Sequence, residues 1–417
     1  MTTARGLRER IGGALLLLVL LAGAILTAGY LHLRTGVPSM EGDATLAGIR
    51  DSVEIRWDAR AIPHVFATSE RDALFAQGFV HARHRLWQLE LLRRTARGRL
   101  AELFGEPALE SDRLVRTLDL WGAARSSVSS LGPDASERLD AYVAGVNAGI
   151  DAREGPLPPE FLILGVEPGR WSPTAAAAVG KLMELDLSSW RRELARFHAR
   201  QTLPEAKTAL LRPRYPAWGP TTLSGSGLGR DADAGEAASR NDTPGSVGSS
   251  TSARGLFESS ATISFLEGRG FRASNAWVLS GRRTASGRPI LANDMHLDLR
   301  APSTWYLVAL HADEGDLAVA GMSIPGVPGV VVGYNRGVAW GFTNGMVDDM
   351  DFVVEAVNLD RSSYRTAEGW EPFAARPETI RVRGREEPVV HPVRETVRGP
   401  VVSDLLPDLG ATLSALW

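Results

Sequence analysis

The chain has 417 residues, of which 44% are hydrophobic and 23% are charged, a composition typical of globular rather than disordered proteins. Its formal net charge of −3 excludes the strongly basic surface expected of a nucleic-acid-binding protein. It contains no cysteine, which excludes disulfides, zinc thiolate sites and a cysteine nucleophile.

The N-terminus combines a basic tail with a long apolar run. Residues 1–10 carry arginines, and residues 11–31 contain no charge. As a helix this run is about 31 Å long, enough to cross a bilayer core. Because arginines precede the run, we expect residues 1–10 in the cytoplasm, residues 11–33 as an inner-membrane anchor, and the rest exported to the periplasm or another extracytoplasmic space. A cleaved signal is the alternative, although the run exceeds the usual apolar region of a signal peptide.

Residues 45–212 are predicted to be mostly helical after two short strands. The strands are expected at 52–58 and 62–67, where apolar and polar residues alternate. Ser69 provides a capping-box-like start for a long helix, which we expect to break at Gly98. The apolar face of this helix is made of Phe75, Phe79, Ala82, Leu86 and Leu89. Two further helical stretches are expected at 110–153 and 172–203.

Several common site motifs are incomplete. His81 and His84 are three residues apart on the predicted helix, but no third ligand is evident, so we do not interpret them as a metal site. The segment GMSIPG has Pro325 where a serine-hydrolase elbow requires glycine, which argues against a conventional Ser-His-Asp hydrolase. The glycines of 225–229 follow no strand and do not complete a dinucleotide fingerprint.

The composition changes in the middle of the chain. Residues 224–255 are almost entirely small or polar, and we interpret 213–273 as a spacer or propeptide linker. Beyond it, residues 274–417 are rich in strand patterns. The segments 275–281 and 290–294, joined through a Ser-Gly turn, predict a hairpin. Four more strands are expected at 303–312, 317–324, 329–335 and 338–344.

Ser274 stands where the spacer gives way to the predicted hairpin. A serine hydroxyl is a poor nucleophile unless a base accepts its proton. Cleavage of the bond between Ala273 and Ser274 would free an α-amino group, whose ordinary pKa of about 7.7–8 allows it to act as that base near neutral pH. Nucleophile and base would then belong to one residue, preceded by a segment that can move away.

Three long motifs, in the same order, resemble the penicillin acylase (penicillin amidase) family of N-terminal-nucleophile hydrolases. IPHVFATSERDALFAQGFVHARHRLWQLELLRRTARGRLAELFG is similar to the family's α-chain block, and SNAWVLSGRRTASGRPILANDMHL to the start of its β-chain. PGVPGVVVGYNRGVAWGFTNGMVDDMDF resembles its oxyanion and calcium region. The resemblance runs from about residue 45 to the end. It implies an α+β fold with a four-layer αββα sandwich and a largely helical α-chain.

The resemblance also implies the active-site residues. Ser274 would be the nucleophile freed by autoproteolysis after Ala273, and His296 would orient its amine or the substrate. The backbone N–H of Asn344 would help to stabilise the oxyanion, an effect that typically contributes about 10²–10³ in rate. A structural role for His296 or Asn344 is the alternative. The apolar acyl pocket would be lined by Trp277, Met295 and Leu297.

A single structural calcium ion is implied in the same way. The carboxylates of Asp348 and Asp351, the carbonyl of Met350 and the carboxylate of Glu193 match the family's calcium ligands. Hard oxygen donors at short spacing suit calcium. The ion would tie the α part to the β part after cleavage. The alternative is a solvated acidic turn.

The chain departs from the family pattern in three places. Ala273 replaces the usual glycine before the nucleophile, and His84 stands where aspartate is frequent. Residues 274–417 are also far shorter than the family's β-chain, so we expect the family's oxyanion asparagine side chain and a nearby arginine to be missing.

The activity implied is that of an amidohydrolase precursor that becomes an α/β heterodimer of its own cleaved chains. It would hydrolyse acyl-amide bonds, such as those of penicillin and cephalosporin side chains or N-acyl homoserine lactones, through an acyl-enzyme intermediate on Ser274. The alternative is an inactive, truncated or split remnant that acts as a binding module or requires a separate C-terminal half.

Overall fold

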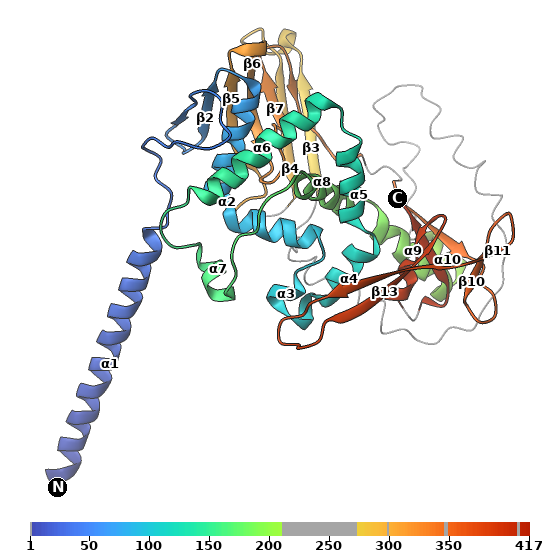
Figure 1. Cartoon of the computed structure of the whole chain (residues 1–417), viewed down its shortest axis with the longest axis horizontal. Coiled ribbons are helices and arrows are strands. Elements are labelled where there is room, and N and C mark those ends of the chain that lie inside the picture. Colours follow the sequence, from blue (N-terminus) through green and yellow to red (C-terminus); the bar gives the residue numbers. More distant parts are fainter. Residues whose placement is uncertain (1, 211–272, 298–299, 346–348, 407–408) are drawn as a thin grey trace. The chain divides into compact units, whose positions relative to one another are not determined.

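The computed structural model describes residues 2–210, 273–297, 300–345, 349–406 and 409–417 (Figure 1). Helices and strands are both abundant, which confirms the predicted α+β class. Of the described residues, one compact unit contains 2–186, 273–345 and 380–389, and a second contains 187–210, 349–379 and 390–417. Each unit therefore takes residues from both sides of the predicted spacer 213–273, which lies outside the described residues except for Ala273.

The first helix, α1 (Thr2–Arg34), is long and apolar enough to cross a membrane. The candidate span is Gly12–Arg34, with a mean hydropathy of 2.4, and none of its side chains is buried against the protein. A helix of this kind near the N-terminus is consistent with either of the two predictions, an anchor or a signal sequence.

The long helix α2 (Glu70–Ala96) begins where the sequence predicts. The hydroxyl of Ser69 accepts a hydrogen bond of 3.2 Å from the backbone N–H of Asp72, a typical N-cap. The helix kinks at Arg85, and the predicted break at Gly98 is confirmed, since its φ of 62° is left-handed. The remaining helices of this unit are α3 (Ala101–Phe104), α4 (Leu109–Thr117), α5 (Leu120–Ser129), α6 (Pro133–Asp151), α7 (Pro159–Leu164) and α8 (Pro173–Leu187).

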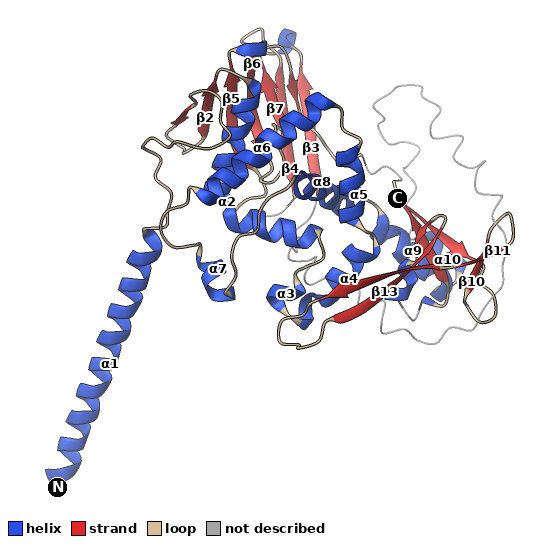
Figure 2. Ribbon diagram, in the orientation of Figure 1, coloured by secondary structure: helices blue, strands red, loops and turns tan. Residues whose placement is uncertain are grey.

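A six-stranded sheet forms the β layer of the first unit, in the order β1-β2-β5-β6-β7-β8. Its strands are β1 (Glu54–Trp57), β2 (Pro63–Ala67), β5 (Tyr306–Ala312), β6 (Leu317–Ser323), β7 (Val332–Asn335) and β8 (Ala339–Trp340). The strand expected over 338–344 is therefore much shorter in the structure. In Figure 2, helices α2 and α6 lie over one face of this sheet. That face is apolar, because Val65, Val308 and Leu310 pack with residues of α2, α6 and α8 in one core.

Helices α2 and α6 approach each other almost backbone to backbone. A Cβ atom on Gly145 would lie 1.8 Å from the carbonyl oxygen of Phe75, and one on Gly78 would lie 2.1 Å from that of Tyr142. No side chain fits in either place, so only glycine allows this contact. The close packing fixes the two helices as one platform against the sheet.

A buried hydrogen-bonded chain joins this platform to the sheet. Nδ1 of His81 lies 2.8 Å from the hydroxyl of Tyr142, and Nε2 lies 3.0 Å from Oγ of Ser323. Because Ser323 donates to the carbonyl of Tyr306, its oxygen accepts from Nε2–H, and Nδ1 accepts from Tyr142. The Tyr142 oxygen in turn accepts from the N–H of Gly326 at 2.8 Å. Every polar atom of His81 is satisfied, so this residue is structural.

His84, the other histidine of the pair, has a different partner. Its Nδ1 lies 2.9 Å from the hydroxyl of Tyr306. Burial, with a smaller effect of nearby arginines, lowers the pKa of His81 to about 3 and that of His84 to about 4. Both rings are therefore neutral hydrogen-bonding groups near pH 7.

Within the described residues, the second unit contains small sheets and two α-helices, α9 (Trp190–Thr202) and α10 (Glu205–Leu210). Its strands are β9 (Asp351–Glu355), β10 (Ser363–Arg365), β11 (Trp370–Pro372), β12 (Ala374–Ile380, except its last residue), β13 (Val389–Thr396, except its first residue), β14 (Gly399–Pro400) and β15 (Thr412–Leu416). The end of β9 is fixed by an ion pair between the buried carboxylate of Glu355 and Arg398, whose Nε lies 2.9 Å away. Although burial acts to raise it, this guanidinium holds the pKa of Glu355 below its usual value.

We expect Tyr142→Phe to lower the free energy of unfolding by about 1–3 kcal/mol, because His81 and the Gly326 N–H each lose a partner in a buried site. Chemical denaturation monitored by circular dichroism measures this change. Tyr334→Phe is the matched control, since Tyr334 is 60% exposed and should change stability by less than about 0.5 kcal/mol. Equal effects of the two substitutions would contradict the network.

We also expect His84 to make stability dependent on pH. The unfolded state binds a proton at this ring below about 6.5, whereas the folded state binds it only near 4. The unfolded state therefore holds more protons in this window, and the stability contributed by neutral His84 is lost as the pH falls from about 6.5 toward 4.

The variant His84→Gln lacks this titration, so the stability of wild type relative to the variant should fall by up to about 1.4 kcal/mol per pH unit below pH 6. Measuring the difference removes the contribution of Asp112, which both proteins share. Burial raises the pKa of Asp112 to about 6, which acts in the opposite direction. A difference independent of pH would show that His84 is not held neutral.

Candidate active site

Ser274 lies near the start of an antiparallel hairpin. Strand β3 (Ala273–Leu279) pairs with β4 (Ile290–His296), which confirms the predicted hairpin. In this register Ala273 lies opposite His296, and Ser274 lies opposite Met295. The predicted scissile bond therefore joins the first two residues of a hydrogen-bonded strand, where the serine is half-buried. A nucleophile at this point is held by a rigid element.

His296 is paired with an acid that the sequence analysis does not include. Its Nε2 lies 2.9 Å from Oδ2 of Asp294, two residues earlier on β4. Side chains two residues apart on a strand share a face. The position of Asp294, two residues before His296, is therefore the sequence signal for this pair. When the ring is neutral, a proton on Nε2 is donated to the carboxylate and leaves Nδ1 as an acceptor. Both exposed side chains lie beside the start of β3 on the face of Ala273, which is opposite to the face of Ser274 because side chains alternate along a strand.

The residues predicted to line the acyl pocket occupy both faces of the hairpin. Met295 is the cross-strand partner of Ser274 and shares its face. Trp277 is three positions after Ser274, so strand alternation places it on the opposite face, where it is 52% exposed. Leu297 follows β4 directly and is half-buried. The structure therefore brings Met295 and Ser274 together and separates Trp277 from them.

Asn344 lies in the segment that follows strand β8, and it is exposed. This segment is bound to the hairpin by the side chain of Asn293. The amide Nδ2 of Asn293 donates to the carbonyls of Asn275 and Phe342 at 2.9 and 3.0 Å, and its Oδ1 accepts from the N–H of Phe342 at 3.0 Å. Asn293 is thus a residue of the site that the sequence analysis missed. A side chain bonded to backbone 49 residues away leaves no local sequence signal.

The predicted calcium ligands belong to the second unit, except that Asp348 lies outside the described residues. Helix α9, which carries Glu193, lies against β9, which begins with Asp351. The carboxylate of Glu193 pairs with Arg196 at 2.8 Å, Asp351 is exposed, and Met350 is only 2% exposed. Within the described ranges, no three acidic or histidine side chains are grouped as a metal site. The calcium site stays a prediction.

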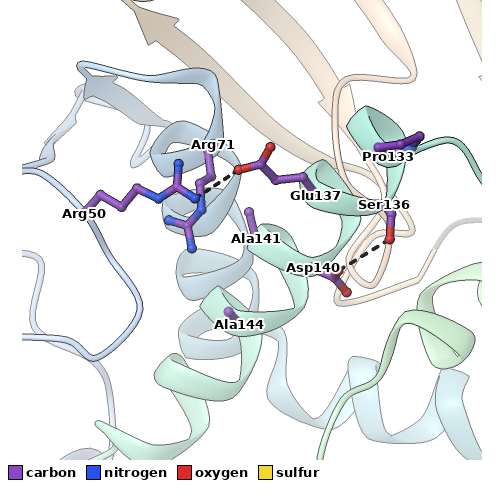
Figure 3. Close-up of a pocket in the computed structure, with 8 residues that line it drawn as sticks. All are labelled: Arg50, Arg71, Pro133, Ser136, Glu137, Asp140, Ala141 and Ala144. Carbon is purple, nitrogen blue, oxygen red and sulfur yellow. Dashed lines mark hydrogen bonds and ion pairs between the residues drawn. The ribbon is translucent and has the colours of Figure 1, made fainter.

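A pocket of about 520 Å³ lies elsewhere in the first unit (Figure 3). It is lined by Arg50, Arg71, Pro133, Ser136, Glu137, Asp140, Ala141 and Ala144, none of which belongs to the hairpin. Arg50 lies 3.0 Å from Glu137 within the pocket, and Arg71 pairs with Asp72, which is not a lining residue. The side chains of Arg50 and Glu137 are largely exposed, so we do not assign this pocket to catalysis.

Comparison with known proteins gives consistent matches. The sequence model of the penicillin amidase family matches residues 52–417. The acyl-homoserine lactone acylase QuiP of Pseudomonas aeruginosa is 34% identical over 374 residues, which are 89% of this chain and 42% of that protein. The penicillin acylase 2 proenzyme of Pseudomonas sp. (strain SE83) is 36% identical over 375 residues, which are 89% of this chain and 46% of that protein.

Two solved structures of a thermostable penicillin G acylase from Alcaligenes faecalis also match. The orthorhombic form is 29% identical with a TM-score of 0.30, covering 35% of this chain and 25% of that one. The tetragonal form is 24% identical with a TM-score of 0.34, covering 41% and 96%. The chain spans less than half the length of the two curated relatives named above.

Proposed function

The chain belongs to the penicillin amidase family, and on this basis we propose that it is the precursor of an amidohydrolase that cleaves linear acyl amides. The proposed substrates are penicillins, cephalosporins or N-acyl homoserine lactones, in line with what its relatives are named for. The observation that carries the proposal is the position of Ser274, the second residue of a rigid strand directly after the predicted spacer.

The proposed activation is autoproteolysis between Ala273 and Ser274. The new α-amino group accepts the proton of the Ser274 hydroxyl as Oγ attacks the amide carbonyl of the substrate. The tetrahedral oxyanion accepts a hydrogen bond from the backbone N–H of Asn344. The amine then returns the proton to the leaving nitrogen, the C–N bond breaks, and the acyl group remains on Oγ. Water, deprotonated by the same amine, releases the acid and restores the serine.

His296 has the part of a positioning group in this mechanism. Its Nε2 is held by Asp294, and the register places it opposite Ala273, beside the start of β3 where the amine would be freed and on the face opposite to the Ser274 side chain. It is therefore suited to orient the amine or the substrate. Met295, on the face of Ser274, is suited to line the acyl pocket, with Leu297 and Trp277 as the other proposed liners.

We further propose that the whole protein has the four-layer αββα sandwich and is an α/β heterodimer after cleavage. The hairpin carries apolar side chains that are exposed in this chain, namely Trp277 (52%), Val278 (66%) and Ile290 (44%). Exposed apolar area of this kind is what a further sandwich layer would cover. The second candidate is a non-catalytic binding module, or a half that requires a separate C-terminal part. The observation that favours it is that the chain matches only 42% of the length of the QuiP acylase of Pseudomonas aeruginosa.

The location we propose is the periplasm, with α1 as an inner-membrane anchor. Calcium is proposed as a structural ion of the second unit. Glu193 and Asp351 would supply carboxylates from adjacent elements, with the carbonyl of Met350 and the carboxylate of Asp348. Bound there, the ion would neutralise these acids and tie α9 to β9.

We expect the purified full-length protein to resolve on a denaturing gel into two chains and to hydrolyse a chromogenic phenylacetyl or aliphatic acyl anilide. Ser274→Ala removes the attacking hydroxyl and should remain a single, inactive chain. Ser280→Ala, an exposed serine after β3, is the matched control and should cleave normally. A wild type that stays uncleaved and inactive, with a folded circular-dichroism spectrum, would support the binding module instead.

Calcium should raise the melting temperature of the EDTA-treated protein by about 2–4 °C at saturating concentration, because the ion binds the folded state. Glu193→Gln should abolish this shift. Glu205→Gln, an exposed acid on the neighbouring helix α10, should keep it. Since the Glu193–Arg196 pair is on the surface, its loss alone should cost less than about 0.5 kcal/mol. A shift that survives Glu193→Gln would contradict the proposed ligand.

A further inference from the structure

The side-chain amide of Asn293 joins three segments of the first unit. It lies on β4 and uses both of its N–H groups and its carbonyl oxygen in hydrogen bonds of 2.9–3.0 Å. An asparagine side chain has two donors and one acceptor oxygen, so all of its polar groups are engaged. A side chain held at three points has little freedom to rotate.

The partners of this amide are backbone groups next to the proposed catalytic residues. One is the carbonyl of Asn275, the residue after Ser274. The other two are the N–H and carbonyl of Phe342, two residues before Asn344. Strand β8 pairs with β7 and ends at Trp340, so Phe342 lies outside that backbone ladder and is bonded to the hairpin through the Asn293 side chain.

Gly341 is shaped to fit this contact. A Cβ atom at this position would lie 2.7 Å from Oδ1 of Asn293 and 2.8 Å from its Cβ and Cγ atoms. The backbone of Gly341 is not in the left-handed region, so an alanine is allowed by conformation and excluded only by the contact. The absence of a side chain at 341 is therefore required by Asn293 lying against it.

No other residue type at position 293 can make the same bonds. Aspartate has the same shape but cannot donate, so its carboxylate would face the carbonyls of Asn275 and Phe342 without a hydrogen between them. Alanine would leave all three backbone groups without this partner. Glutamine is longer by one methylene and would collide with the segment that Gly341 allows to approach.

We infer, on the basis of the proposed function, that Asn293 is a positioning residue that sets the segment 341–344 in register with strand β3, which carries Ser274. The nucleophile and the oxyanion donor lie on different chain segments, and a misplacement of about 1 Å between such groups can cost about 10²-fold in rate. Asn293 makes no contact with the reacting atoms, so it acts through the backbone of Asn275 and Phe342.

The test uses Asn293→Asp and Gly341→Ala in the full chain, with Gly337→Ala as the matched control. A Cβ on Gly337 meets only Oδ1 of Asn335, at an ordinary 3.8 Å. Amide hydrogen exchange at Phe342 reports directly on its hydrogen bond to the side chain of Asn293, and this measurement requires no enzymatic activity. The rate of acyl-anilide hydrolysis is divided by the amount of cleaved chain to give kcat.

Both Asn293→Asp and Gly341→Ala should speed exchange at Phe342 by at least tenfold, while exchange in β5 and β6 is unchanged. Both should lower kcat by about 10²-fold with KM within about threefold, because positioning of the transition state is lost and binding is not. The control should keep wild-type values. Failure of both variants to cleave, with the control cleaved and β5 protected, also supports the inference.

Unchanged exchange at Phe342, or faster exchange with unchanged kcat, would overturn the inference while wild-type activity remains. A wild type with no activity would instead contradict the proposed function. In that case, equal protection of the Phe342 amide in wild type and Asn293→Asp would also show that Asn293 does not hold Phe342.

Discussion

The backbone pairing of β3 with β4 is the constraint on which the site depends. Its register sets Ser274 opposite Met295 and Ala273 opposite His296. A slip of one residue would move the serine to the other face of the hairpin, because side chains alternate along a strand. The direction of the proposed nucleophile is therefore fixed by a hydrogen-bonded ladder, and cleavage at the edge of that ladder would leave the serine in place.

The hairpin in turn depends on what lies around it in the first unit. Helices α2 and α6 pack through Gly78 and Gly145, and the buried chain through His81 ties them to β6. The sheet ends at β8, and the amide of Asn293 connects the residues after β8 to the hairpin. The buried polar groups around His81 therefore fix the scaffold, and the side-chain amide of Asn293 aligns the proposed site.

Much of the first unit can be predicted from its local patterns. Ser69 caps a helix, Gly98 ends one, and the alternation around Trp277 predicts a strand, because each signal acts within a few residues. The kink at Arg85 and the partners of His81 cannot be predicted in this way. They depend on segments that are distant in the sequence, such as Ser323, which lies 242 residues from His81.

The candidate site likewise contains residues that local motifs predict and residues that depend on distant contacts. Ser274, His296 and Asn344 follow from motifs, whereas Asn293 depends on a contact across 49 residues and on the empty space at Gly341. Asp294 could be found from its spacing to His296, since residues two apart share a strand face. Apolar residue type alone predicts the pocket residues, whereas strand alternation places Trp277 and Met295 on opposite faces of the hairpin.

The most direct measurement is N-terminal sequencing of the active protein, after native purification and titration of its sites with substrate. Activation by autoproteolysis predicts that every active molecule contains a chain beginning Ser274-Asn275-Ala276, whose freed amine serves as the base. Full amide hydrolysis by a polypeptide that is still continuous from Ala273 to Ser274 would contradict it.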